Sequence, residues 1–196
     1  DESEGIIGEW MQLRNNRDQI VLASKFGARP IDPRAESPVY DELTKESIFK
    51  SVENSLRRLR TDYLDLSYIH ADFKEYPLDE RMEALFLLEK QGKIRFKGCS
   101  NISSSRVVDS ELVNAKNDWS SFQAIQQKFS YLLPNVIDEN APLKFLDGPM
   151  LDFAEENNVS LLTYSVLLSG AYNKGYDSLP KEYDSLLNKV KFESII

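Results

Sequence analysis

The sequence has 196 residues and a net charge of −8, from 32 acidic and 24 basic residues, and 41% of its residues are hydrophobic. This composition is typical of a globular domain, and we expect one domain over residues 1–196. No basic stripe is present, which argues against a nucleic-acid partner, and no apolar run approaches the roughly 18 residues of a membrane span. The single cysteine, Cys99, excludes an intrachain disulfide. Together with the lack of a visible signal peptide, this cysteine content favours a cytoplasmic location.

Helical and strand-like segments alternate along the chain. Apolar residues at helical spacing predict a first helix over residues 6–13, ended by the polar residues 15–18. Short apolar runs predict strands at residues 19–26, 63–70, 94–99, 122–129 and 160–166. Between them we expect a helix after a Thr44 N-cap, with one face marked by Ile48, Val52, Leu56 and Leu59, and further helices at residues 78–91, 103–117 and 148–158. The tail from residue 171 is expected to be a loop that becomes helical.

Strands that alternate with helices predict parallel strands joined by right-handed crossovers. An open five-stranded sheet fits this order. So does a parallel β/α (TIM-type) barrel of the α/β class that is incomplete as given, with about five of eight strand–helix units. We favour the incomplete barrel, because the chain opens on a helix, closes at residues 189–192 within an unfinished helical pattern, and is shorter than the roughly 250 residues of a complete barrel.

Two unusual residues end the first two predicted strands. Ligands and catalytic groups of parallel β/α folds lie at the carboxyl ends of the strands. Lys25 ends an apolar run, where a lysine costs desolvation energy unless it is paired or functional; alternatively, it extends to solvent. His70, the single histidine, ends the next strand; a lone histidine there is often structural, but the pair together favours a catalytic site.

Polar groups also end the next three strands. Ser100 and Asn101 follow the third strand and suit the amide or carbonyl of a neutral ligand, although both residue types are also good helix N-caps. Gln126 is a polar residue within the fourth strand, and Tyr164 closes the fifth as core or as a flat platform for a ring. The sequence has neither a G-x-G-x-x-G motif nor a P-loop, and one histidine with one cysteine makes a zinc site improbable.

Three stretches carry a family resemblance. They are DQIVLASK at residues 18–25, SLRRLRTDYLDL through His70 at residues 55–70, and GKIR through GCSN at residues 92–101. In order and spacing, these stretches resemble the aldo-keto reductase family over nearly the whole chain. The resemblance implies a β/α barrel that binds extended NADP(H) without a Rossmann fold. It also implies hydride transfer between the nicotinamide and a small-molecule aldehyde or ketone.

The resemblance assigns Lys25 and His70 to half of an Asp/Tyr/Lys/His catalytic tetrad. A lysine cation beside a tyrosine lowers the pKa of the phenol, so that it can protonate the carbonyl oxygen while histidine orients the substrate. The aspartate would hold the lysine. In the family pattern the aspartate and tyrosine lie upstream of Asp1, so we expect the isolated segment to be inactive.

The resemblance also implies a set of cofactor contacts around the nicotinamide and the pyrophosphate. By this resemblance, the nicotinamide carboxamide contacts Ser100, Asn101 and Gln126, and Tyr164 stacks on the nicotinamide ring. The pyrophosphate path is lined by Ser165, Leu167, Ser169 and Gly170, with Lys174 close to a phosphate. In the family pattern, the region that binds the adenosine 2′-phosphate would follow Ile196. Val166 stands where relatives often have proline, and residues 127–129 replace a more usual Asn-Glu-Tyr, which we expect to alter local packing rather than chemistry.

Three functional interpretations remain open at this point. The first is an NADP(H)-dependent carbonyl reductase of which this chain is an internal segment. The second is a cofactor-binding regulatory subunit, because potassium-channel β subunits use the same barrel. The third is a truncated relative without activity. The substrate, and whether the protein is a monomer or a homo-oligomer, do not follow from the sequence.

Overall fold

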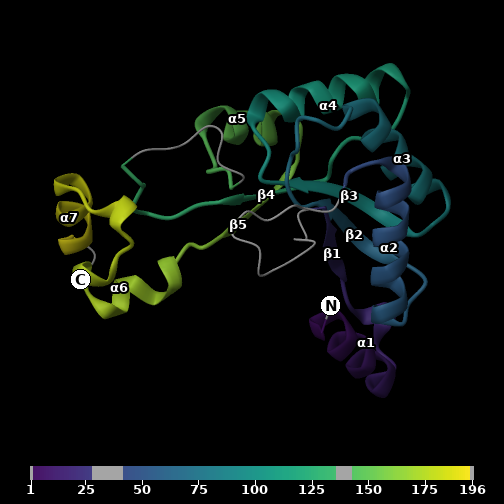
Figure 1. Cartoon of the computed structure of the whole chain (residues 1–196), viewed down its shortest axis with the longest axis horizontal. Coiled ribbons are helices and arrows are strands. Elements are labelled where there is room, and N and C mark those ends of the chain that lie inside the picture. The colour runs from purple at the N-terminus through teal and green to yellow at the C-terminus, as the bar shows by residue number, and fades with distance from the viewer. Residues whose placement is uncertain (1, 28–41, 136–142, 195–196) are drawn as a thin grey trace.

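A computed structural model describes residues 2–27, 42–135 and 143–194. Five parallel strands form one sheet in the order of the chain. The strands are β1 (Ala23–Phe26), β2 (Leu64–Ile69), β3 (Ile94–Ser100), β4 (Ala124–Lys128) and β5 (Ser160–Tyr164). Helices on one side of the curved sheet connect them (Figure 1): α2 (Lys45–Leu59), α3 (Leu78–Lys90), α4 (Ser104–Lys116) and α5 (Gly148–Glu156). The predicted incomplete β/α barrel is therefore confirmed.

The main core lies between the sheet and these helices. Side chains of α2 that recur at helical spacing, Ile48, Val52 and Leu59, are at most 1% exposed. Along β4, Ile125 and Gln127 are buried while Gln126 is half-buried, so alternate residues point toward the helices and away from them. This alternation turns Gln126 and Lys128 to the concave side of the sheet, where a barrel keeps its interior.

The strands are shorter than the apolar runs that predict them, for local reasons. The first run loses its beginning because residues 17–19 form a single-turn 3-10 helix, η1 (Arg17–Gln19). The fifth ends at Tyr164 because Ser165 has φ of +60°, a left-handed backbone that cannot continue a strand. The helix ends agree with their sequence signals: the Thr44 hydroxyl accepts from Ser47 N at 3.3 Å, and Gly92, at φ of +70°, follows α3.

The chain after β5 forms a small second cluster beside the sheet (Figure 1). It contains α6 (Ala171–Lys174), α7 (Leu186–Glu193) and three single-turn 3-10 helices, η2 (Leu168–Gly170), η3 (Tyr176–Ser178) and η4 (Lys181–Tyr183). Its apolar centre consists of five buried side chains: Leu132, Leu168, Ala171, Tyr183 and Phe192. The predicted tail is thus a set of short helices that pack on the segment after β4.

Helix α1 (Glu2–Arg14) packs on the end of α2 through a glycine. A Cβ atom at Gly8 would lie 2.5 Å from Arg58 O and 2.7 Å from Leu59 C, so the two backbones are in contact. Glu4 strengthens this contact, because its carboxylate accepts from Arg58 Nε at 2.6 Å and from Ser24 Oγ at 2.8 Å. These bonds join α1 to both α2 and β1.

Ion pairs and hydrogen bonds stabilise the amino-terminal edge of the sheet. The Asp65 carboxylate accepts from Arg17 at 2.9 Å, from Arg95 at 2.8 Å and from Leu22 N at 2.9 Å. The guanidinium carbons of the two arginines both lie 3.9 Å from the centre of the Tyr63 ring. Burial disfavours the Asp65 carboxylate, but these hydrogen bonds outweigh burial and hold its pKa below the usual range. This edge stabilises the fold and lies opposite the predicted site.

A buried ion cluster fixes the loop after β2. The Asp72 side chain is 5% exposed and accepts from Arg81 at 2.8 Å and from Arg106 at 2.9 and 3.1 Å. Arg81 belongs to α3 and Arg106 to α4, so one carboxylate joins the starts of two helices. Burial disfavours the ionised Asp72, yet the hydrogen bonds from Arg106 and Arg81 hold its pKa below the usual range.

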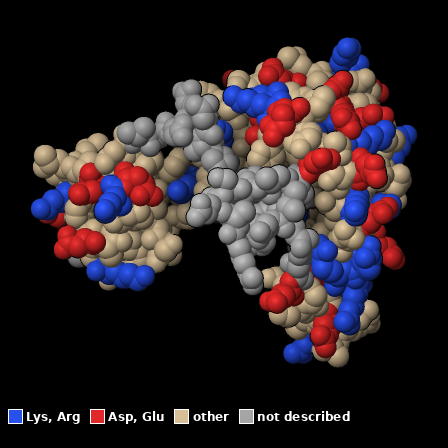
Figure 2. All heavy atoms as spheres, viewed as in Figure 1, with Lys and Arg blue, Asp and Glu red and all other residues tan. Residues whose placement is uncertain are grey.

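The surface mixes both signs of charge. Figure 2 shows acidic and basic side chains interspersed over the face that carries the helices. Within the described ranges, no helix combines the length and apolarity needed to cross a membrane. Nor do three histidine, cysteine, aspartate or glutamate residues of those ranges gather closely enough to hold a metal ion.

The contact between α1 and α2 predicts opposite effects for two glycine substitutions in the same helix. Gly8→Ala forces a methyl group into the α2 backbone and should lower the free energy of unfolding by about 1–3 kcal/mol. Gly5→Ala meets no atom within 4 Å and should be neutral or stabilising by up to about 1 kcal/mol, because alanine favours helix. Urea denaturation of both variants tests this, and equal midpoints would contradict it.

The Asp72 cluster predicts a loss of stability in acid. Because the pKa of Asp72 is lowered in the folded protein, its contribution is present above the unfolded pKa of about 3.9 and disappears as pH falls through the folded pKa. Asp72→Asn should cost about 3–5 kcal/mol at pH 7, because two partly buried guanidinium groups lose their carboxylate. Urea melts from pH 7 to pH 3 should show a smaller acid loss in the variant than in the wild type.

Candidate functional site

The parallel register brings the predicted residues of all five strands to one edge of the sheet. Lys25 pairs with Tyr68, Ser100 with Gln126, and Lys128 with Tyr164. His70 follows β2 directly, and its backbone N donates to Phe26 O at 2.9 Å, one residue beyond Lys25. The candidate site is therefore the carboxyl-terminal edge, where this architecture places ligands.

Lys25 lies against an aromatic ring on the concave side of the sheet. Its Nζ is 5.7 Å from the ring centroid of Tyr68, within the range of a cation–π contact. Partial burial lowers the pKa of the Lys25 ammonium below its ordinary value. Among the described residues, no carboxylate lies within ion-pair distance of Lys25. The cation is therefore held by the ring and the strand backbone.

His70 is exposed, but both of its backbone groups are bonded. Its N–H donates to Phe26 O, and its carbonyl accepts from Asn101 Nδ2 at 2.9 Å. The two bonds attach His70 to the neighbouring strands on either side of β2. The backbone of His70 is therefore held between the ends of β1 and β3.

Asn101 connects three strand ends through its amide. Nδ2 donates to His70 O and, at 3.1 Å, to Ser100 Oγ, while Oδ1 accepts from Tyr164 Oη at 2.5 Å and Lys144 N at 3.3 Å. The residue has φ of +50°, a conformation that asparagine tolerates better than most residues. A ligand that binds Asn101 Oδ1 would compete with Tyr164 and Lys144 for the same lone pairs.

Gln126 and Tyr164 are half-buried on the same edge. Gln126 is in register with Ser100 on one side and Leu162 on the other, so its amide projects from the middle of the concave face. Burial raises the pKa of the Tyr164 phenol above its ordinary value. Both side chains offer polar groups next to an apolar surface.

The loop after β5 holds several non-glycine residues in the left-handed region. Ser165, Leu168 and Ser169 have φ of +60°, +45° and +55°, and Gly170 has φ of +80°. Such strain costs roughly 1–3 kcal/mol per residue and concentrates at ligand sites. The predicted pyrophosphate residues therefore lie on the most strained described segment of the chain.

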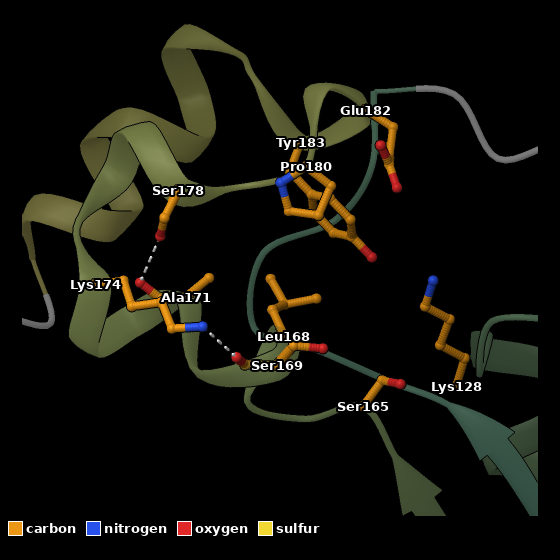
Figure 3. Close-up of a pocket in the computed structure, with 10 residues that line it drawn as sticks. All are labelled: Lys128, Ser165, Leu168, Ser169, Ala171, Lys174, Ser178, Pro180, Glu182 and Tyr183. Atoms are coloured by element: carbon orange, nitrogen blue, oxygen red, sulfur yellow. Dashed lines mark hydrogen bonds between the residues drawn. The ribbon is translucent and has the colours of Figure 1, made fainter.

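A cavity of about 210 Å³ opens beside this loop (Figure 3). Ser165 and Ser169 line it, as the sequence predicts for a pyrophosphate path, whereas Leu167 and Gly170 are absent from its lining. Lys174 also lines it and donates from Nζ to Ser169 O at 3.2 Å.

Two further lining residues, Lys128 and Tyr183, were not among the predicted contacts. The place of Lys128 at the end of a strand is a signal that could have indicated it. Nothing in the sequence singles out Tyr183, because it belongs to the tail that was expected to be mostly loop.

Comparison with known proteins agrees with this architecture. The family model described as "Aldo/keto reductase family" matches residues 1–191. The chain is 27% identical to an aryl-alcohol dehydrogenase of Pestalotiopsis microspora, over 87% of this chain and 42% of that protein. It is 29% identical to norsolorinic acid reductase of Aspergillus flavus, over 90% of this chain and 43% of that protein.

A solved structure adds the same result in three dimensions. An aldo-keto reductase from Bacillus halodurans, in its holo form, superposes with a TM-score of 0.66 and 26% identity, over 93% of this chain and 54% of that one. The chain thus spans about half the length of these relatives. Since the family model covers nearly every residue and the sheet has the matching architecture, the chain belongs to the aldo/keto reductase family.

Proposed function

We propose that this protein is an NADP(H)-dependent oxidoreductase that reduces a small-molecule aldehyde or ketone to an alcohol. The observation that supports this most strongly is that Lys25, in β1, and His70, directly after β2, come to the same carboxyl-terminal edge of the sheet. Membership of a family of oxidoreductases supports the reaction type. The proposed reaction also requires the aspartate and tyrosine of the tetrad.

Lys25 sets the acidity of the proton donor in this proposal. An ammonium group beside a phenol favours the phenolate and lowers the phenol pKa, so the tyrosine can deliver a proton to the carbonyl oxygen near neutral pH. The strand backbone and the Tyr68 ring hold the Lys25 cation at the edge of the sheet. His70 orients the carbonyl from the adjacent strand, on a backbone bonded on both sides.

The polar residues of the same edge fit a dinucleotide. Ser100, Asn101 and Gln126 offer hydroxyl and amide groups for a carboxamide, and Tyr164 offers a flat ring beside them. The hydroxyls of Ser165 and Ser169 share a cavity with Lys174, which suits the pyrophosphate; Leu167 and Gly170 belong to the same loop. When bound, the reduced nicotinamide supplies the hydride that the carbonyl carbon receives.

Aromatic aldehydes are the first substrates to test. One relative is described as an aryl-alcohol dehydrogenase, which supports an aryl substrate here as well. The single buried cysteine, Cys99, supports a reducing cytoplasmic setting, and the acidic composition supports a small-molecule partner rather than a nucleic acid.

The catalytic assignment predicts a loss of turnover with retained cofactor binding. With NADPH and an aromatic aldehyde, Lys25→Met and His70→Ala in the full-length protein should each lower kcat by about 10²–10⁴. NADPH affinity should stay within about threefold of the wild type, because neither side chain holds the cofactor in this proposal. Lys50→Met, at an exposed position of α2, is the control. Equal turnover in the wild type and both site variants would refute these roles.

The platform assignment predicts that Tyr164 acts through its ring. Tyr164→Phe keeps the ring and should change NADPH affinity by less than about threefold. Tyr164→Ala removes the ring and should weaken affinity about tenfold, in line with stacking energies of roughly 1–3 kcal/mol. Fluorescence titration of NADPH measures both, with Tyr131→Ala at an exposed aromatic as the control. A Tyr164→Ala variant that binds like the wild type would remove Tyr164 from the site.

A further inference from the structure

The cavity beside β4 and β5 holds two groups that the proposed function leaves without a task, the Lys128 ammonium and the Tyr183 hydroxyl. We propose that they form an anion-binding subsite that takes the diphosphate of a dinucleotide and sets its affinity. This inference rests on the proposed function, because the dinucleotide is the cofactor assigned there. It adds two contacts that the family resemblance does not supply.

Lys128 brings to the cavity wall a positive charge that has no ion-pair partner among the described residues. It is the last residue of β4, half-buried on the concave side, and its Nζ lies 4.9 Å from the Phe145 ring centroid and 6.0 Å from that of Tyr183. Glu182 lines the same cavity, but no ion pair joins it to Lys128 in the described structure. Two aromatic rings therefore position the ammonium and leave its N–H donors available to a ligand.

Tyr183 contributes a buried donor without a partner. The residue is 1% exposed, and its hydroxyl has no hydrogen-bond partner among the described residues. In Figure 3 its side chain reaches into the cavity from the wall that also carries Pro180 and Glu182. A buried hydroxyl without a partner is costly, and an anionic oxygen in the cavity would satisfy it.

The remaining lining suits a diphosphate. Ser165 and Ser169 carry hydroxyl groups, and Lys174 adds a second ammonium, so two cations face the single carboxylate of Glu182. The volume of about 210 Å³ is below the roughly 300–1,000 Å³ of pockets for drug-sized ligands. The cavity therefore suits part of a dinucleotide, and its charge selects the diphosphate.

The charge at position 128 gives a sharp comparison. A carboxylate in this cavity would repel a diphosphate, whereas the Lys128 ammonium attracts it. Under this proposal the ammonium raises cofactor affinity, and the effect weakens as salt screens the charge.

The test is NADPH affinity in the purified protein, measured by nicotinamide fluorescence at low and high salt, with inorganic pyrophosphate as competitor. Lys128→Glu should weaken NADPH binding by about tenfold or more at low salt, and less at high salt, and should abolish competition by pyrophosphate. Lys128→Arg keeps the charge and should stay within about threefold. Lys50→Glu makes the same charge change on exposed α2, away from the cavity, and should leave affinity unchanged.

Tyr183→Phe separates a binding role from a structural one. Removal of an unpartnered hydroxyl should leave the Tm of the ligand-free protein unchanged or raised, while NADPH affinity falls by about threefold to tenfold. A lower Tm with unchanged affinity would make Tyr183 structural and overturn its part in the subsite.

The outcomes distinguish this inference from the function on which it rests. If the wild type binds NADPH and Lys128→Glu matches Lys50→Glu, the subsite is refuted and the proposed function stands. If the wild type binds pyrophosphate through Lys128 but binds neither NADPH nor NADP⁺, the subsite stands and the cofactor assignment fails. Failure to bind any of these ligands refutes both.

Discussion

The site depends on the hydrogen bonds of one side-chain amide, that of Asn101. Through His70 O, Ser100 Oγ and Tyr164 Oη, the Asn101 amide joins the carboxyl ends of β2, β3 and β5. The backbone hydrogen bonds of the parallel sheet place these ends at one edge, and the bonds of the Asn101 side chain add connections between them. The left-handed backbone of Asn101 directs its side-chain amide across the edge of the sheet. The three hydrogen bonds therefore depend on this backbone conformation.

The polar groups at the two edges of the sheet differ in how fully they are hydrogen-bonded. At the amino-terminal edge, the Asp65 carboxylate accepts hydrogen bonds from Arg17 and Arg95, and the Tyr63 ring contacts both guanidinium groups. At the carboxyl-terminal edge, Lys25 has no carboxylate partner among the described residues, and Tyr183 has an unpaired hydroxyl. Satisfied polar groups stabilise a fold, whereas unsatisfied ones are costs that a ligand can remove. Unsatisfied polar atoms also occur elsewhere in the described structure, such as Asn16 Oδ1 before η1 and Asn114 Nδ2 in α4, so the strand topology is what places the candidate site at this edge.

Much of the architecture could be predicted from local patterns. Runs of apolar residues and helical spacing located all five strands and helices α1 to α5, because burial on a sheet or a helix face imposes those periods. The predictions were weakest at strand ends. The first predicted strand begins at residue 19, which belongs to η1, and Ser165, inside the fifth predicted strand, leaves it in a left-handed conformation. Strand ends depend on backbone partners and turns that apolar content does not encode.

The sequence by itself determined the family, the parallel sheet and the residues at strand ends, since each follows from short-range pattern or from order along the chain. Tertiary structure alone decided which of these residues meet. The Asn101–Tyr164 hydrogen bond joins residues 63 positions apart. Lys128 and Tyr183 share a cavity only because the helices after β5 fold back over the end of β4. Such contacts depend on how the elements pack, and the periodicity of any one segment carries no information about that packing.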